Sequence, residues 1–329
     1  NILLVHPPLP NAPFGCFHAK LMLLFFDGWM RVVVASGNLI PYDWETNENV
    51  IFVQDFPIVQ ATGSNIGNLH PFAQDIKDFI LAIGLKNHIV NKLSQYDFSR
   101  AKAKLVASIP GAYKGVENIK KYGHGRLCKV VQEVCGQNEN IILECQTSTL
   151  GGLTADFLHE FYRSASGIDP LEISKPRTKK SQGVETPLPQ MTMVYPSNRT
   201  VSSSKYSKAA GAALFFGKSN YEKHTFPKEI IRQSVEHCVY AYLLSKKMKQ
   251  MHSLTCIYST LGKISTSRET KGPQLRINNW ELGVFFPIRG SENDQGDWFT
   301  ENGVPVPYQR PPRRYDLNDT PWVSLEFCI

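Results

Sequence analysis

The sequence lacks the segments that mark membrane and secreted proteins. No apolar run approaches the roughly 18–20 residues that a membrane-spanning helix needs, and the longest runs, such as residues 21–26, have the length of a strand. The chain begins at Asn1 with neither an initiator methionine nor a basic region ahead of an apolar one. We therefore expect no signal peptide, no membrane partner, and an excerpted or late-starting chain.

The cysteine pattern argues against two further kinds of site. The seven cysteines are scattered, odd in number and free of any Cys-x-x-Cys pair. This pattern is untypical of a disulfide framework and of a zinc site. We expect a reducing compartment, the cytosol or the nucleus.

The composition is that of a chain with a substantial core. Of 329 residues, 42% are hydrophobic and 20% are charged, which is enough for one large domain or two of ordinary size. The formal net charge is +7. That excess is compatible with a polyanionic partner, but many basic proteins bind no nucleic acid.

Strand-like and helix-like segments alternate in both halves, which predicts α/β layers. An Asp27-Gly28 turn predicts a hairpin between the first two strands. Pro110-Gly111 is the candidate boundary between a first domain, 1–111, and a second, 112–329, in which the basic residues 174–189 predict an exposed loop. We expect strands at 17–26, 30–35, 49–54, 104–107, 141–145, 191–195 and 277–286, and helices at 71–83, 127–134, 154–164 and 227–249.

Three polar residues of the first half are positioned for phosphoryl chemistry. His18 and Lys20 alternate on a strand and therefore share a face, and the hairpin returns Asn38 alongside them. A neutral imidazole attacks phosphorus, while lysine and asparagine donate to the non-bridging oxygens. No carboxylate cluster accompanies them, so we expect neither a metal nor another cofactor. On its own, however, a His-x-Lys pair is far more often a strand-edge histidine and a solvated lysine.

The surrounding motifs favour the catalytic interpretation. They are Phe14-Gly15-Cys16-Phe17-His18-Ala19-Lys20, residues 31–44, Ser148-Thr149-Leu150-Gly151, Tyr195-Pro196-Ser197, Trp280-Glu281-Leu282-Gly283-Val284, Pro307-Tyr308 and residues 311–315. In this order, along nearly the whole chain, these segments resemble the motifs of the tyrosyl-DNA phosphodiesterase 1 family of the phospholipase D superfamily.

The resemblance implies a phospholipase D-like α/β fold of two similar α/β/α sandwich domains with a shared active site at their interface. It implies a DNA-repair hydrolase that releases topoisomerase I from single-stranded or nicked DNA 3′ ends, with a related exonuclease action on other 3′ adducts. The partners implied are DNA and a topoisomerase I-derived peptide, without a cofactor or membrane. The chain would act as a monomer in the nucleus.

The same resemblance assigns roles to residues of the reaction centre. His18 would be the nucleophile that forms a covalent phosphohistidine, and His252 the general acid that protonates the leaving tyrosine. Lys20, Asn38 and Glu281 would support them, with Glu281 orienting a histidine. The alternative for Glu281 is an ordinary strand-end carboxylate.

Further residues match positions that bind DNA in the family. Asn49 occupies the supporting position of the first half, and Phe14 the position of an aromatic ring that stacks on a base. Ser148 and Thr149 precede a helix, where hydroxyl and amide groups favour a phosphate. The alternatives are a core role for Phe14 and a purely structural turn at Ser148 and Thr149.

The second half departs from the family pattern. Leu254 stands where a lysine follows His252, no second asparagine motif follows, and Glu281 comes only 29 positions after His252. The N-terminal part that precedes the first motif in the family is also missing. Each lost phosphoryl donor of this kind costs roughly 2.7–4 kcal/mol of transition-state stabilisation.

Three functions therefore compete. The first is an active tyrosyl-DNA phosphodiesterase, and the second is a catalytically impaired homologue that only binds DNA ends. The third is another phospholipase D-type hydrolase acting on lipids or small phosphodiesters, which the aromatic and Trp-Glu-Leu-Gly signatures disfavour.

Overall fold

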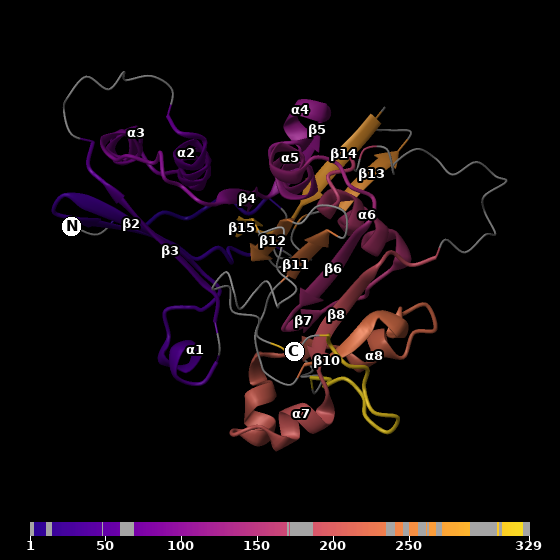
Figure 1. Cartoon of the computed structure of the whole chain (residues 1–329). Coiled ribbons are helices and arrows are strands. Elements are labelled where there is room, and N and C mark those ends of the chain that lie inside the picture. Colours follow the sequence, from indigo (N-terminus) through magenta and orange to yellow (C-terminus); the bar gives the residue numbers. More distant parts are fainter. Residues whose placement is uncertain are drawn as a thin grey trace.

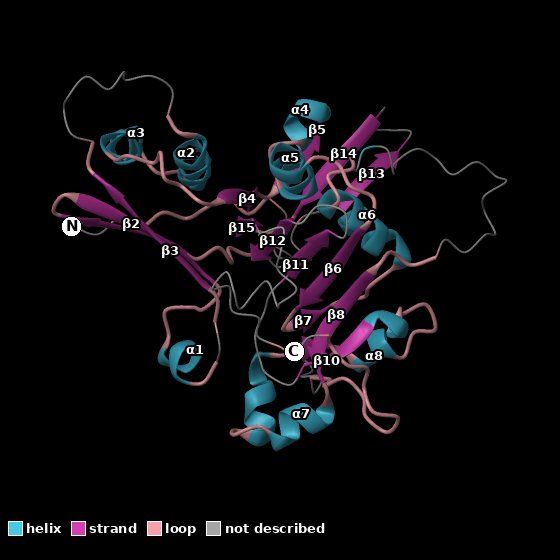
Figure 2. Ribbon diagram, in the orientation of Figure 1, coloured by secondary structure: helices cyan, strands magenta, loops and turns pink. Residues whose placement is uncertain are grey.

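The computed structural model of the chain has mixed α/β architecture, as predicted, and Figures 1 and 2 show its strands and helices in layers. In the part of the chain that the structure describes, no helix has both the length and the apolar character to cross a bilayer. The described residues are 3–10, 15–47, 49–59, 69–169, 171, 187–234, 241–245, 250–255, 261, 263–267, 272–289, 308 and 311–324.

The first half is built on an antiparallel sheet of three strands, β1 (Leu21–Phe26), β2 (Trp29–Ala35) and β3 (Ile51–Pro57). The predicted hairpin turn is confirmed, because Phe26 pairs with Trp29 and Gly28 has a φ of +84° that glycine adopts without strain. Helix α1 (Pro41–Glu45) lies in the connection between β2 and β3.

The helix predicted over 71–83 is confirmed as α2 (Pro71–Ile83), and it covers one face of this sheet. Proline begins the helix, where a missing N–H costs nothing, and the left-handed Gly84, at φ +107°, ends it. The short helices α3 (Asn87–Val90) and η1 (Asn91–Gln95) follow. The apolar face of α2 buries Phe72, Ala73, Ile76, Phe79 and Ile80.

A seven-stranded sheet forms the centre of the molecule, in the order β10-β8-β6-β11-β12-β15-β4 (Figure 1). The first three strands, β10, β8 and β6, are parallel to one another. The four remaining neighbouring pairs, from β6 to β4, are antiparallel. The bounds are β4 (Lys104–Ser108), β6 (Ile141–Gln146), β8 (Met191–Pro196), β10 (Ile231–Ser234), β11 (Ala241–Ser245), β12 (Gln250–Thr255) and β15 (Glu281–Arg289).

Strand β4 joins the two halves of the chain. It precedes the boundary predicted at residue 111, yet it pairs with β15 in the central sheet. The apolar cluster under α2 likewise includes Trp280, Leu282 and Val284 from the end of the chain. The two halves therefore share core residues around β15.

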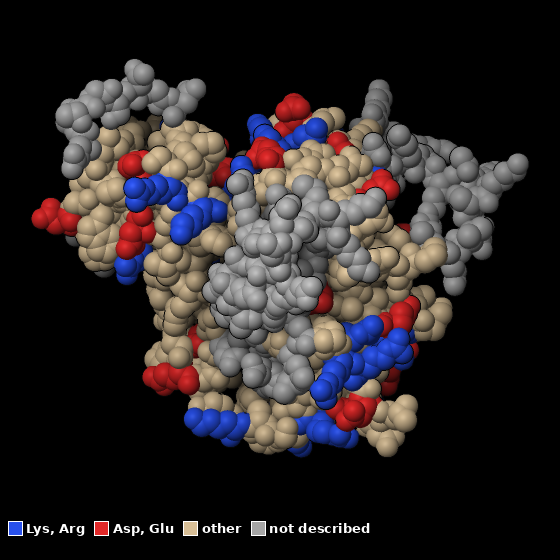
Figure 3. All heavy atoms as spheres, viewed as in Figure 1, with Lys and Arg blue, Asp and Glu red and all other residues tan. Residues whose placement is uncertain are grey.

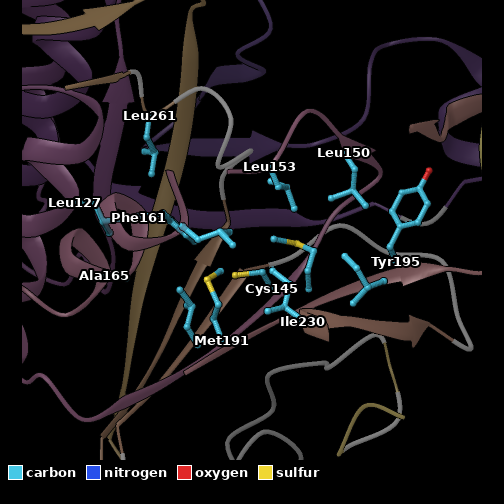
Figure 4. Packing of buried hydrophobic residues seen from close by; sticks show 14 of the residues in the cluster. Leu127, Cys145, Leu150, Leu153, Phe161, Ala165, Met191, Tyr195, Ile230 and Leu261 are labelled. Carbon is cyan, nitrogen blue, oxygen red and sulfur yellow. The ribbon is translucent and has the colours of Figure 1, made fainter. Parts of the chain in front are cut away.

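Helices α5 (Gly123–Cys135) and α6 (Ala155–Ala165) pack on the central sheet and on each other, after the single turn α4 (Val116–Ile119). Thr154 caps α6 by accepting the Phe157 N–H at 3.2 Å. Figure 4 shows the apolar cluster here, in which Leu127 and Phe161 of the helices meet Cys145 and Met191 of the strands.

Smaller elements complete the second half. Strands β5 (Gly111–Lys114), β13 (Lys263–Ser267) and β14 (Gly272–Ile277) form an antiparallel sheet, and β7 (Thr149–Leu150) pairs with β9 (Phe215–Phe216) in parallel. The short helices are α7 (Asn198–Ser203), η4 (Ser207–Ala213), α8 (Lys218–Tyr221) and η5 (Lys228–Ile230).

Two expectations from the sequence are wrong. The helix expected over 227–249 contains strands β10 and β11, because its apolar residues pair with the sheet: Ile231 lies opposite Met193, and Leu243 opposite Leu143. The single strand expected over 277–286 is the end of β14 and most of β15, with a break between them. The predicted loop at 174–189 lies outside the described residues except for 187–189.

Candidate active site

The segment that carries His18 is attached to the start of β15. Phe17 forms a parallel bridge with Trp280, and the His18 N–H donates to the Trp280 carbonyl at 3.0 Å. The Trp280 N–H donates back to the Cys16 carbonyl at 2.9 Å. Trp280 is fully buried, and its indole N–H donates to the Pro8 carbonyl at 2.9 Å. This anchoring places His18 beside Glu281.

The His18 imidazole and the Glu281 carboxyl group form the central contact of the site. Glu281 Oε2 lies 3.2 Å from His18 Nδ1, and the His18 side chain is 41% exposed while that of Glu281 is only 10% exposed. A carboxylate only accepts hydrogen bonds, so this contact assigns the proton to Nδ1. Nε2 is then the nitrogen that presents a lone pair, and His18 lines the cavity described below.

Lys20 lies beside the histidine in the segment before β1, because the strand expected from residue 17 begins only at Leu21. Its Nζ donates to the His18 carbonyl at 2.8 Å, and the side chain is half-buried. Burial lowers the pKa of the Lys20 ammonium group, while the nearby carboxyl groups of Glu281 and Asp43 act in the opposite direction. Lys20 therefore places a positive charge next to the nucleophile, and it is not among the described residues that line the cavity.

Asn38 is held by a residue that the sequence analysis did not single out. Both its backbone N–H and its side-chain Nδ2 donate to Asp43 Oδ2, at 2.6 and 2.8 Å. The Trp44 indole N–H donates to the Asn38 carbonyl at 2.6 Å. The Asn-x-x-x-x-Asp-Trp spacing, on a turn into α1, was the sequence signal available for this pair of contacts.

Asn49 packs against the same turn. Its Oδ1 accepts from Ser36 Oγ at 2.8 Å, and its Nδ2 donates to the Asp43 carbonyl at 2.5 Å. A Cβ on Gly37 would lie 2.9 Å from the Asn49 side chain, so only glycine fits between them. The Ser-Gly-Asn turn thus brings Asn38 and Asn49 to one edge of the three-stranded sheet.

A cavity of about 780 Å³ unites these residues with the second half of the chain. His18, Asn38 and Asn49 line it from the first half, and the predicted Ser148 and Thr149 line it from the second. The hydroxyl of Tyr42 in α1 donates to the Ala209 carbonyl of η4 at 3.4 Å, which links the two sides.

Several polar residues of the cavity wall were not predicted. Arg199 and Lys205 bring positive charge from the region of α7, and Gln233 enters from β10. The Ser-Ser-Ser-Lys run at 202–205 was the available signal, because hydroxyl groups followed by a cation are typical of phosphate contacts. The second half therefore contributes hydroxyl and cationic donors.

Two predicted residues, His252 and Phe14, have side chains that lie outside the described part of the chain. The backbone of His252 lies in β12 opposite Pro287, six positions along β15 from Glu281, and at about 3.3 Å per residue this is roughly 20 Å. Leu254, where a lysine was sought, pairs with Phe285. Phe14 lies outside the described residues. The acid role of His252 and the stacking role of Phe14 stay predictions.

The site combines an oriented imidazole with cationic, amide and hydroxyl donors. Among the described residues, no three His, Cys, Asp or Glu side chains are grouped so as to hold a metal ion. A nucleophilic nitrogen surrounded by such donors is suited to attack on an anionic phosphorus centre, because the donors stabilise charge on its oxygens.

Comparison with known proteins agrees with this chemistry. The chain is 27% identical to tyrosyl-DNA phosphodiesterase 1 of Arabidopsis thaliana and 24% identical to that of Drosophila melanogaster, over 98% and 95% of its length. It spans only 61% and 57% of those two relatives.

The phospholipase D-like fold is confirmed by solved structures of yeast tyrosyl-DNA phosphodiesterase. A variant of the yeast protein matches with a TM-score of 0.66 at 15% identity, over 95% of this chain and 78% of the other. A second yeast structure matches with a TM-score of 0.63 at 16% identity, again over 95% and 78%. The family model for tyrosyl-DNA phosphodiesterase matches residues 1–316, and the chain therefore belongs to the tyrosyl-DNA phosphodiesterase family.

Proposed function

We propose that the chain hydrolyses the phosphodiester bond between a DNA 3′ end and tyrosine, with His18 as the nucleophile. The observation that carries this proposal is the contact of 3.2 Å between His18 Nδ1 and Glu281 Oε2 at the wall of the cavity. That contact leaves Nε2 free to attack. Family membership supports the choice of a 3′-phosphotyrosyl substrate.

The reaction has two steps. In the first, His18 Nε2 bonds to phosphorus while the bond from phosphorus to the tyrosine oxygen breaks and that oxygen takes up a proton. In the second, water attacks the phosphohistidine, the nitrogen–phosphorus bond breaks, and a DNA 3′-phosphate is released. Lys20 and Asn38 stabilise the negative charge on the phosphoryl oxygens, and Ser148 and Thr149 hold the DNA strand.

The general acid of the first step is assigned to His252 by the family pattern alone. The second candidate function is an impaired homologue that only binds DNA ends, and it rests on the sequence alone. In that candidate the chain binds DNA 3′ ends in the same cavity but lacks a positioned acid, so cleavage is impaired. Leu254 in place of the expected lysine points in the same direction.

Cleavage of a 3′-phosphotyrosyl oligonucleotide in the presence of EDTA tests the proposal. We expect release of tyrosine and a 3′-phosphate by the wild-type chain and complete loss of both in His18→Ala. Binding without cleavage at high protein concentration supports the second candidate, and neither binding nor cleavage contradicts both.

His252→Ala separates the two candidates. If His252 is the acid, the variant accumulates a covalent protein–DNA adduct or loses cleavage. If the wild-type chain cleaves and His252→Ala does so at the same rate, His252 has no acid role. Lys263→Ala, at the start of β13, is a matched control in the same part of the chain.

The biological setting follows from the substrate. We propose a role in DNA repair in the nucleus, acting as a monomer on topoisomerase I-derived peptides left at 3′ ends. Cell fractionation and light scattering of the purified chain test the location and the oligomeric state, with a cytosolic or dimeric protein as the contrary results.

A further inference from the structure

A second, smaller cavity of about 210 Å³ lies beside β10. Three cationic side chains line it, those of Lys228, Arg232 and Arg314. Two carboxyl groups, of Glu229 and Asp319, line it as well. The pocket therefore carries an excess of positive charge, and nothing in the reaction described above uses it.

The cations of this pocket are held in place without being neutralised. Arg232 Nη1 donates to the carbonyl oxygens of Glu229 and Ile231, at 2.6 and 2.8 Å. The Lys228 ammonium lies over the ring of Tyr221, 4.6 Å from its centre. Within the described ranges, neither these two cations nor Arg314 forms an ion pair with a carboxyl group.

The arginines also repel each other. Burial lowers the pKa of Arg232, and the positive charge of Arg314 adds to that effect. Asp319 forms no ion pair with either arginine in the described part of the chain: its Oδ1 accepts the backbone N–H groups of Arg199 and Thr320, at 3.3 and 3.0 Å, and its buried Oδ2 has no hydrogen-bond partner there. An anion bound in the pocket would pair with both guanidinium groups and reduce their repulsion.

The pocket adjoins the reaction cavity at two points. Arg232 lines the pocket while its neighbour Gln233 lines the reaction cavity, as alternation on a strand allows. Asp319 lines the pocket and holds the backbone of Arg199, which lines the reaction cavity. Strand β10 is the edge strand of the central sheet, and the C-terminal segment lies along its outer side, because the Gln233 N–H donates to the Arg313 carbonyl at 2.7 Å. A ligand strand would therefore run from one cavity to the other over that segment.

We propose that this pocket binds a phosphate of the DNA backbone, away from the phosphate that is cleaved. Guanidinium groups bind phosphate oxygens through paired N–H donors, and a lysine adds a mobile charge. Figure 3 shows lysine and arginine side chains gathered where Figure 1 places β10 and α8, with acidic side chains beside them. The inference rests on the proposed function, because it assigns the path of the same substrate strand.

The length and salt dependence of DNA binding test this site. Fluorescence anisotropy is measured with single-stranded oligonucleotides of about 4 and about 16 nucleotides over a range of salt concentrations. The double variant Arg232→Gln/Arg314→Gln is compared with the charge-matched Lys86→Gln/Lys92→Gln, which removes two exposed cations at α3 and η1 on the opposite side of the molecule (Figure 1). Circular dichroism verifies that both variants fold.

We expect the arginine double variant to weaken binding of the long oligonucleotide about tenfold and to lower its salt slope by about 0.7 for the one phosphate released. Binding of the short oligonucleotide, which reaches only the reaction cavity, should stay unchanged. The control should bind both as the wild type does. If the arginine double variant and the lysine control lose the same affinity, or if the arginine double variant loses the same affinity for the short and the long oligonucleotide, the second phosphate site alone is overturned. Failure of the wild-type chain to bind either oligonucleotide overturns the proposed function as well.

Discussion

At the scale of single residues, the account depends on which nitrogen of His18 carries the proton. Glu281 is mostly buried while His18 is partly exposed, so the carboxyl group is fixed and the ring is oriented by it. A ring held through Nδ1 presents Nε2 to the substrate, and Nε2 is then the nitrogen whose lone pair can attack phosphorus.

Replacing Glu281 by glutamine tests this orientation. The amide can donate to Nδ1 or accept from it, so the preference for one tautomer is lost. We expect kcat to fall roughly 10²- to 10⁴-fold with a much smaller change in KM. A variant that keeps the wild-type kcat would show that the contact does not orient the nucleophile.

The clamp between Asn38 and Asp43 makes a second prediction. Asp43→Ala removes the acceptor of both Asn38 contacts, so the amide is free to rotate. We expect kcat to fall about 10²-fold, comparable to the loss of one donor to a charged transition state. Asp43→Asn keeps one acceptor oxygen and should recover part of the rate, whereas identical losses in the two variants would contradict the clamp.

At the scale of secondary structure, Trp280 connects the histidine segment to β15. Its backbone bonds to Cys16 and His18, its indole N–H reaches Pro8, and its ring lies 5.8 Å from those of Phe17 and Phe79. The position of the nucleophile is therefore set by a residue more than 260 positions away in sequence.

Trp280→Phe should weaken this connection without removing the ring contacts. Loss of the hydrogen bond to Pro8 and of part of the buried indole is expected to lower the free energy of unfolding by about 1–3 kcal/mol. Chemical denaturation measures the change. Wild-type stability in the variant would mean that the segment is held by its backbone bonds alone.

Local signals explain which elements could be predicted. The Asp27-Gly28 turn and the Pro71 to Gly84 helix carry their own start and stop residues, and both are confirmed. The segment 227–249 carries no such signal inside it, and its apolar residues fit a helix face or a buried strand equally well. The segment forms strands β10 and β11 rather than a helix because these pair with β8 and β6 of the central sheet.

At the scale of the whole molecule, the site exists only because distant parts of the chain meet. The motifs predicted His18, Lys20, Asn38 and Glu281, and the structure brings all four together. Sequence reasoning from motifs did not find Asp43 or Arg199, because their roles depend on a turn and on the packing of α7 against the cavity.

Buried charge predicts how the stability of the molecule depends on pH. Burial raises the pKa of Glu160 from 4.5 to about 7, although its Oε1 accepts the Ile264 N–H at 2.6 Å. The folded state therefore holds a proton that the unfolded state releases between pH 4.5 and about 7. The contribution of this proton to the free energy of unfolding is fully present below pH 4.5. It is lost as the pH rises to about 7, and the total loss is roughly 3 kcal/mol.

Glu160→Gln removes this dependence while keeping an acceptor for Ile264. At a pH near 4.5, the pKa of the unfolded state, we expect the variant and the wild type to have the same melting temperature. At a pH well beyond 7, we expect the melting temperature of the variant to be several degrees higher than that of the wild type. Differential scanning calorimetry at the two pH values measures the difference. An equal difference at both would attribute the effect to packing rather than to ionisation.

The central claim is that His18 forms a covalent bond to the DNA 3′ end. It is tested most directly by incubating the chain with a 3′-phosphotyrosyl oligonucleotide in EDTA, quenching with alkali and locating the adduct by mass spectrometry. The account predicts a phosphohistidine at His18, absent from His18→Ala. An adduct at another residue, or cleavage that His18→Ala retains, would contradict it.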